Sequence, residues 1–168
     1  VAPLQFAATV GAVVNGGTRL TPTFLKRAAA PVAGERVIGA ATSASMRELM
    51  RLGVTHAAGT GRRAEAEGYG VGGKTGTAEM PGRGGYRAKA VIASFVGAFP
   101  MEQPQYMTLV LLFEPQGTPE TGGRITAGVN AAPVTARIVE RVAPILGVLP
   151  RLVEARTDPA FDAPGQAQ

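Results

Sequence analysis

The stretch that decides the fold runs Val71-Gly72-Gly73-Lys74-Thr75-Gly76-Thr77-Ala78-Glu79. It places one cation and two hydroxyl groups among small residues, so that backbone can approach a bound group from several sides. A positive charge beside fixed hydroxyl donors suits the binding of an anion. The segment is therefore the candidate site, and its function depends on whether it forms a loop before a helix or an extended strand.

A phosphate-binding loop is the first interpretation, because residues 68–75 fit the nucleotide-binding pattern of a glycine, four residues and Gly-Lys-Thr. Such a loop follows a buried apolar strand and opens into a helix whose N-terminus holds the phosphates. Residues 61–67 are too polar for that strand, and residues 75–85 contain Pro81 and four glycines. In a helix each interior glycine costs ~1 kcal/mol and a proline ~3 kcal/mol. The required helix is not predicted, and a nucleotide-binding protein is the minor alternative.

An extended strand from Gly70 to Glu79 is the second interpretation. Its glycines leave an open edge that a substrate backbone can approach. Lys74 and the hydroxyls of Thr75 and Thr77 are then expected to line that opening. The following residues, Met80–Arg87, are predicted to form a turn-rich loop beside it.

The composition limits the chemistry that the chain can perform. Its 168 residues, 45% of them hydrophobic, suffice for one domain with a core. There is no cysteine, which excludes disulfides and thiolate metal sites. The single histidine, His56, excludes a multi-histidine metal centre and a Ser-His-Asp triad, and it is interpreted as a surface or capping residue. No cofactor or metal is predicted.

The charge of the chain is basic but dispersed. The formal net charge is +5 and the isoelectric point is about 10.2, yet basic pairs occur only at Lys26-Arg27 and Arg62-Arg63. With few aromatic residues to stack on bases, nucleic-acid binding is not predicted. No run of about 18 apolar residues is present, and the chain opens on Val1 rather than Met, so we expect a piece of a longer protein.

The first half of the chain is predicted to contain two helices. Pro3 and an apolar stripe predict a helix of about twelve residues that stops at residues 15–17, Asn-Gly-Gly. Ser45 and Glu48 have capping-box spacing and predict a second helix that ends near residues 53–56. The connecting segments are predicted as an irregular strand over Thr18–Leu25, a surface connection over Lys26–Gly39 and a flexible loop over Gly59–Gly68.

The second half is predicted to contain a hairpin and a closing helix. Ala90–Phe99 and Gln105–Phe113 are apolar, β-branched and aromatic runs joined by a short turn. Ala131–Leu146 has helical periodicity, with Pro144 expected to fray its last turn. The fold class is therefore α+β, an antiparallel sheet flanked by helices, with one domain over 1–150 and a disordered tail over 151–168.

Four segments in this order resemble a known family. They are the first helix with its Asn-Gly-Gly end, residues 72–78, residues 93–100 and the terminal helix. Together they resemble the C-terminal part of the transpeptidase domain of class B penicillin-binding proteins, and most of all the cell-division type that builds the septum. The resemblance covers the chain to about Pro150 and implies a penicillin-binding fold that lacks its upstream helical part.

The resemblance implies a serine acyltransferase. In the family, a serine attacks the penultimate D-Ala carbonyl of a peptidoglycan stem peptide, an amine of a neighbouring strand resolves the acyl-enzyme, and β-lactams trap the serine. By resemblance Lys74 supplies positive potential, the Thr75 and Thr77 hydroxyls bind the substrate carboxylate, Gly76 belongs to the same substrate-binding strand, and the Thr77 N–H is an oxyanion-hole donor. The implied partners are stem peptides, β-lactams and cell-division proteins. The implied location is the periplasm, with the parent anchored in the bacterial inner membrane.

The sequence departs from the family at the nucleophile. Ser43, Ser45 and Ser94 are the only serines, and none begins a Ser-x-x-Lys or Ser-x-Asn motif. Both motifs are expected upstream of Val1, so the chain alone is predicted to be inactive and to self-associate through exposed apolar surface. The alternatives left open are a non-catalytic penicillin-recognising sensor or scaffold and a β-lactamase.

Overall fold

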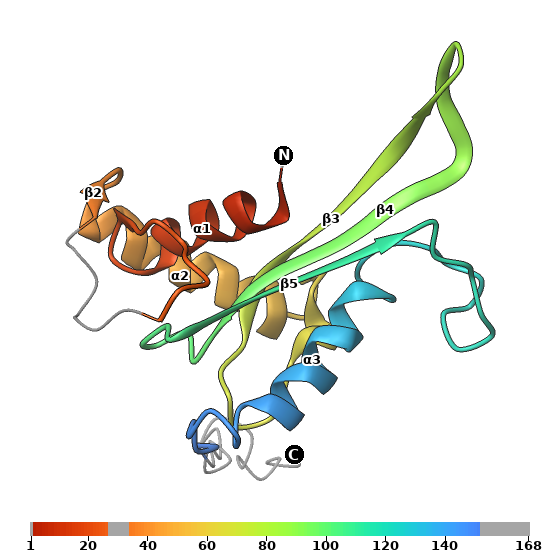
Figure 1. The fold of residues 1–168 in the computed structure, drawn as a ribbon. Helices are drawn as coiled ribbons and strands as arrows, with labels where there is room; N and C mark the ends of the chain where they lie inside the picture. The colour runs from red at the N-terminus through yellow and green to blue at the C-terminus, as the bar shows by residue number, and fades with distance from the viewer. Residues whose placement is uncertain (1, 27–33, 152–168) are drawn as a thin grey trace, which may run out of the picture.

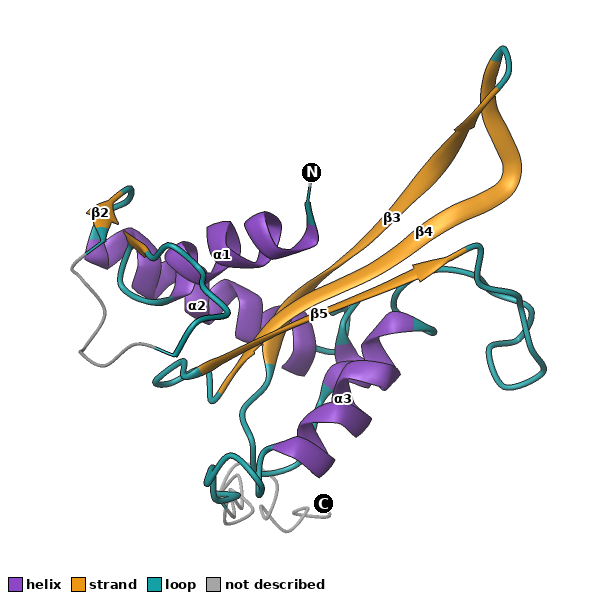
Figure 2. Cartoon of the chain, in the orientation of Figure 1, coloured by secondary structure: helices purple, strands orange, loops and turns teal. Residues whose placement is uncertain are grey.

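The computed structural model describes residues 2–26 and 34–151, without the side chains of residues 88 and 89. A three-stranded antiparallel sheet in the order β3-β4-β5 forms the centre, and helices lie on both of its faces (Figures 1 and 2). This arrangement confirms the α+β prediction. The elements are α1 (Pro3–Val14), β1 (Thr18–Arg19), β2 (Glu35–Arg36), α2 (Ala40–Thr55), the 3-10 helix η1 (Arg62–Ala64), β3 (Gly72–Gly82), β4 (Gly85–Phe99), β5 (Tyr106–Phe113) and α3 (Ala131–Val142).

The β3–β4 hairpin is longer than the sequence predicted and projects from the body of the molecule (Figure 1). The prediction of a turn-rich loop over Met80–Arg87 is wrong, because Pro81 pairs with Tyr86 beyond a register shift that follows Glu79. Only residues 83 and 84 connect the strands. Gly84 and Gly85 have positive φ angles of 82° and 148°, which let the chain reverse in so short a turn.

The two faces of the sheet follow from the two-residue period of its strands. We name the threonine face after Thr75 and Thr77, which stand opposite Phe95 and Ala93. We name the lysine face after Lys74, which stands opposite Val96. Each face extends over all three strands of the sheet.

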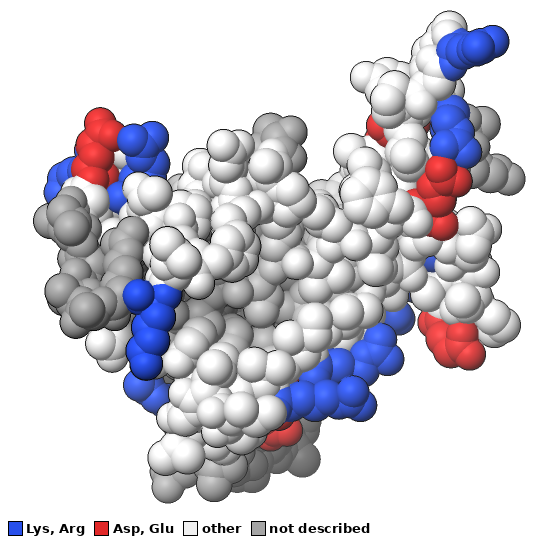
Figure 3. Space-filling model, in the orientation of Figure 1, with Lys and Arg blue, Asp and Glu red and all other residues white. Residues whose placement is uncertain are grey.

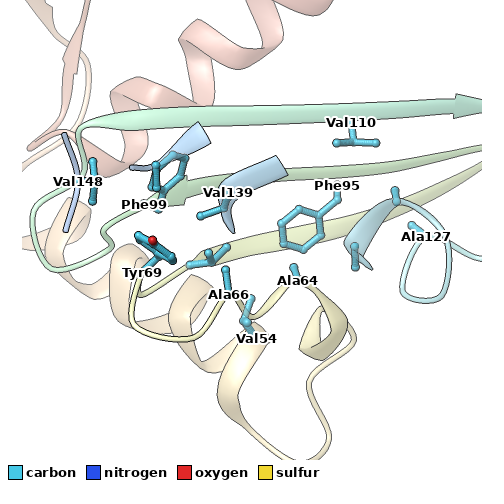
Figure 4. Close-up of a cluster of buried hydrophobic side chains, with 14 of the residues drawn as sticks. Val54, Ala64, Ala66, Tyr69, Phe95, Phe99, Val110, Ala127, Val139 and Val148 are labelled. Atoms are coloured by element: carbon cyan, nitrogen blue, oxygen red, sulfur yellow. The ribbon is translucent and has the colours of Figure 1, made fainter. Parts of the chain in front are cut away.

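The threonine face carries the larger core. Phe95 and Phe99 of β4 are fully buried there together with Val139 of α3 (Figure 4). The Phe99 ring stacks on Tyr106 of β5, with centroids 5.6 Å apart. Complete burial of a phenylalanine or valine side chain contributes about 1.5–3 kcal/mol. Because α3 packs on β4, β5 and η1, this core closes the face with residues of the chain itself.

The lysine face carries a smaller core where α1 and α2 pack. Val14, Met50, Ala98 and Met101 form it. Ser43 of α2 is fully buried beside them, where its hydroxyl donates to Val13 O at 2.6 Å and accepts from Gly16 N at 3.0 Å. Ser43 thus joins the end of α1 to α2, which gives this serine a structural task.

Helix α1 ends at Val14 as predicted, but α2 begins earlier than predicted. Its first residue is Ala40, its N-cap is Gly39, and no side chain caps it. The capping box at Ser45 is therefore wrong: Ser45 lies inside the helix, because the Ala-rich residues before it already favour helix. The predicted end near residues 53–56 is confirmed, and His56 is the C-cap, with Nδ1 accepting from Ala58 N at 3.1 Å.

The connections are more ordered than the sequence suggested. Within the predicted irregular strand, the residues that pair as a strand are Thr18–Arg19, and they pair with Glu35–Arg36 inside the predicted surface connection. The loop over Gly59–Gly68 contains η1, and its Ala64 and Ala66 are fully buried in the threonine-face core, so it is not simply a flexible loop. The short side chains of these alanines let the backbone lie close to the sheet.

The hairpin of β4 and β5 and the start of the closing helix agree with the predictions, but the helix is four residues shorter than the predicted Ala131–Leu146. Helix α3 ends at Val142, just before Pro144, as expected for a residue that lacks an N–H donor. Of the predicted disordered tail, residues 151–168, only Arg151 is described, and its N–H donates to Gly68 O at 2.8 Å; residues 152–168 lie outside the described residues.

Candidate active site

The candidate site lies along β3, at the edge of the described sheet. Strand β3 pairs with β4 on one side, and no described strand pairs with its other side. Residues 72–79 pair with β4 in one continuous register before the shift that follows Glu79, so the predicted extended conformation of Gly70–Glu79 is confirmed from Gly72 onward. The phosphate-binding loop is excluded, because a strand occupies the positions where its helix must run.

A groove of about 970 Å³ opens on the threonine face of β3. Thr75 and Thr77 form one wall. The opposite walls come from the end of α2, from residues 59–65 and from residues 124–129 before α3; the lining residues there are Arg51, Val54, Thr55, Gly59, Thr60, Arg62, Arg63, Glu65, Arg124, Thr126, Gly128 and Val129. Segments far apart in the sequence thus meet around the two predicted carboxylate-binding hydroxyls.

The two threonine hydroxyls are held by neighbouring segments. Thr75 Oγ1 lies 2.7 Å from Thr60 Oγ1, and the two hydroxyls share a hydrogen bond. Thr77 Oγ1 accepts from Ala127 N at 3.2 Å, so its proton is free to be donated elsewhere. Both side chains keep solvent access, Thr75 partly and Thr77 more fully. Donors positioned in this way can bind an ionised carboxylate without reorganising.

Lys74 does not line this groove. Its side chain is exposed, and Nζ donates to Thr75 O at 2.7 Å. Sequence reasoning placed Lys74, Thr75 and Thr77 in one opening, although the two-residue period of a strand already separates adjacent side chains. Lys74 and the threonine hydroxyls lie on opposite faces of the sheet, so they can contact the same ligand only if it lies across the open edge of β3.

Gly73 and Gly76 are glycines for steric reasons. A Cβ on Gly73 would lie 2.4 Å from Phe95 Cζ, and one on Gly76 would lie 2.6 Å from Ser94 Oγ. Ser94 Oγ donates to Gly76 O at 3.2 Å. Sequence reasoning missed the role of Ser94 as a support for β3, because only the strand register brings it opposite Gly76.

Arginines make the groove basic. Arg51 binds both carboxylate oxygens of Glu65, and its Nη1 also donates to Val71 O at 2.6 Å. Arg62, Arg63 and Arg124 line the groove as well, and none of them has a carboxylate partner among the described residues. Sequence reasoning interpreted Arg62-Arg63 as dispersed surface charge. The position of Arg62-Arg63 in the segment that leads into β3 is the signal that could have indicated that both arginines line the groove.

The projecting hairpin is tied to the end of β5. Arg87 Nη1 and Nη2 donate to the two Glu114 carboxylate oxygens at 2.5 and 3.2 Å. That hydrogen bonding and the nearby negative charge raise the pKa of Arg87 above its ordinary value. Glu114 follows β5, as predicted, and has a φ of +49°, a conformation that favours glycine or asparagine. Basic side chains mark the tip of the hairpin and the region of α3 (Figure 3).

The described residues contain no cluster of three or more His, Cys, Asp or Glu side chains that could hold a metal ion. Among the same residues, no helix has the length and apolar character needed to cross a bilayer.

Known proteins resemble this chain in sequence. A family model described as the penicillin binding protein transpeptidase domain matches residues 1–140. Stage V sporulation protein D of Bacillus subtilis is 39% identical over 162 residues, covering 90% of this chain and 24% of that protein. The probable peptidoglycan D,D-transpeptidase FtsI of Caulobacter vibrioides is 38% identical over 157 residues, covering 88% of this chain and 26% of that protein. The chain therefore spans about a quarter of the length of these relatives.

Solved structures agree with the sequence relatives. The apo transpeptidase domain of penicillin-binding protein 3 from Burkholderia pseudomallei superposes with a TM-score of 0.79 at 33% identity, covering 91% of this chain and 45% of that one. Penicillin-binding protein 3 from Mycobacterium tuberculosis in complex with ampicillin gives a TM-score of 0.76 at 25% identity, covering 93% of this chain and 37% of that one. The likeness extends over almost the whole described fold.

Proposed function

The chain belongs to the family of penicillin-binding protein transpeptidase domains, and we propose that it forms one wall of the active site of a peptidoglycan D,D-transpeptidase. The single observation that carries the proposal is the pair of hydroxyls of Thr75 and Thr77, which line one groove on an open strand edge with Lys74 at the same edge. This arrangement suits a peptide that ends in a carboxylate and lies along β3.

The reaction is acyl transfer to a serine supplied from upstream of Val1. The serine Oγ bonds to the carbonyl carbon of the penultimate D-Ala, the C–N bond to the last D-Ala breaks, and that amine leaves with the proton. An amine of a second stem peptide then attacks the ester, releases the serine and forms the crosslink. No oxidant, reductant or cofactor is needed.

Each residue of the β3 edge has a part in this reaction. The Thr75 and Thr77 hydroxyls donate to the terminal carboxylate, and Lys74 adds positive potential next to the upstream serines. Gly76 keeps this part of the strand free of a side chain, so that the substrate backbone can approach it, and the close Ser94 Oγ leaves no room for one. The Thr77 N–H stabilises the oxyanion, a contribution of about 3 kcal/mol in comparable sites.

The parent protein acts outside the cytoplasmic membrane. Peptidoglycan crosslinking takes place there, so we place this domain in the periplasm of a protein anchored by a segment outside this chain. Its role in septum formation follows the relatives whose names include FtsI, and its partners are other cell-division proteins. The β-lactam complexes in the family make penicillins its expected inhibitors.

Intact mass after incubation with a penicillin tests the proposal. We expect a covalent adduct on the protein extended upstream through Ser-x-x-Lys and Ser-x-Asn motifs, called the complete protein below, and none on residues 1–168 alone. Fast loss of the adduct to water would indicate a β-lactamase instead. An extended protein that binds penicillin without an adduct would indicate a sensor or scaffold.

A further inference from the structure

The groove beside Thr75 and Thr77 carries more positive charge than one terminal carboxylate requires. Its lining includes four arginines and one glutamate, an excess of three positive charges. The glutamate, Glu65, is already bound to Arg51 through both oxygens. The excess therefore resides on Arg62, Arg63 and Arg124.

These three arginines differ in how firmly they are held. Arg124 Nε donates to Thr121 O at 3.0 Å, which orients its guanidinium and leaves both terminal nitrogens for other acceptors. Arg62 has only a long contact, from Nη1 to Ala57 O at 3.4 Å. Arg63 makes no hydrogen bond or ion pair with any other described residue and is exposed. Arg63 and Arg124 are the two guanidiniums best placed to accept an added anion.

We propose that Arg63 and Arg124 form a second anion subsite in this groove, which binds a further carboxylate on the same stem peptide whose terminal carboxylate meets Thr75 and Thr77. The inference rests on the proposed function and adds a substrate class to it: peptides that carry a second free carboxylate before the terminal D-Ala pair. Guanidinium groups suit this ligand, because their planar donors match a carboxylate in two parallel hydrogen bonds.

The size of the groove is consistent with a ligand of this kind. Its volume of about 970 Å³ falls in the upper part of the range for pockets that enclose drug-sized ligands, ~300–1,000 Å³. A single carboxylate would fill only the part beside β3. The arginines come from segments that pack against β3 from outside the sheet, so the subsite extends away from the strand.

The test uses the complete protein and two synthetic stem peptides that both end in D-Ala-D-Ala with a free terminal carboxylate. One peptide has its second carboxylate free, and the other has it amidated. Released D-Ala gives kcat/KM for each, and the ratio of the two values measures recognition of the second carboxylate. We expect the wild type to prefer the free form about tenfold, as for one to two charge-assisted hydrogen bonds in a partly solvated groove.

In the variant R63Q/R124Q this ratio should fall toward one, and in R63K/R124K it should largely remain. The matched control is R137Q/R141Q on α3, which removes the same charge outside this groove. The control should keep the wild-type ratio. Replacing Arg124 also removes its hydrogen bond to Thr121 O, so R63Q alone serves as a second variant that leaves this bond intact. In R63Q the logarithm of the ratio should fall to about half of its wild-type value.

Three results would overturn the inference. The first is a wild type without preference, the second is an R63Q/R124Q variant that keeps the wild-type ratio, and the third is an equal loss in R137Q/R141Q. A wild type that forms no penicillin adduct would overturn the proposed function itself, and this inference with it. The mass measurement therefore separates the two failures.

Discussion

The threonine face and the lysine face of the sheet differ in how completely the chain covers them. On the threonine face, Phe95 of β4 and Val139 of α3 are fully buried together. On the lysine face the core is smaller, and Phe113 at the end of β5 is 64% exposed. Apart from the groove beside Thr75 and Thr77, the chain thus covers the threonine face and leaves part of the lysine face open. This difference is what we expect if upstream helices that carry the nucleophile pack on the lysine face.

The largest effect should come from removing the main side chain of the threonine-face core. Phe95→Ala is expected to lower the free energy of unfolding by about 4 kcal/mol, because the cavity lies among fully buried neighbours. Phe113→Ala should cost less than about 0.5 kcal/mol in residues 1–168, as for an exposed position. Urea denaturation measures both. If Phe113→Ala destabilises the complete protein much more than residues 1–168, the lysine face is covered in the complete protein. If Phe95→Ala and Phe113→Ala destabilise residues 1–168 equally, the difference between the two faces is contradicted.

The next effect concerns the lysine face alone. Lys74→Ala in the complete protein should lower the second-order rate constant of penicillin acylation by about 100-fold, since a positioned charge at the reacting centre is lost. Stopped-flow acylation kinetics measure the change, and Lys74→Arg is the variant that retains charge. Acylation within about twofold of the wild type would refute the role assigned to Lys74.

A smaller effect tests how the lysine face supports β3. Gly76→Ala should cost about 2 kcal/mol of stability, because the added Cβ meets Ser94 Oγ. Ser94→Ala alone should cost about 1 kcal/mol through its lost hydrogen bond to Gly76 O. The double variant should lose less stability than the sum of the two single losses, because Ser94 Oγ is the one heavy atom of the described residues, Gly76 and its chain neighbours aside, within 4 Å of the added Cβ. Additive losses would mean that the strain arises elsewhere.

The smallest effect lies beyond both faces, in the projecting hairpin. Arg87→Gln removes its pair with Glu114 and should speed tryptic cleavage at Arg83 only about threefold, as for an exposed contact that limits local opening. The pKa of Arg87 is raised in the folded protein, so its contribution is complete below the ordinary pKa and is lost only as pH rises through the folded value. The difference in cleavage should therefore be the same at about pH 7 and about pH 9 and should shrink with added salt. A salt-independent difference would exclude the ion pair as its cause.

Much of the fold could be predicted from local signals. Proline at the start and glycines at the end gave α1 its limits, and apolar β-branched runs predicted β4 and β5. The helix breakers after Lys74 correctly excluded a phosphate-binding loop. The errors arose where two local signals competed: Ser45 has the spacing of a cap but lies inside α2, and the glycine-rich residues 80–87 extend the hairpin. In the first place the helix begins five residues before Ser45, and in the second the two strands continue into the glycine-rich residues.

The sequence by itself determined that Lys74, Thr75, Gly76 and Thr77 share one strand, and the order of its segments determined the family. Only the tertiary structure decided what those residues face. The partners of Thr75, Thr77 and Arg87 are Thr60, Ala127 and Glu114, which lie 15 to 50 residues away along the chain. Such contacts depend on how α2, α3 and the sheet pack together, and no local pattern in the sequence encodes that packing. The arginine-lined groove is for the same reason a property of the folded chain.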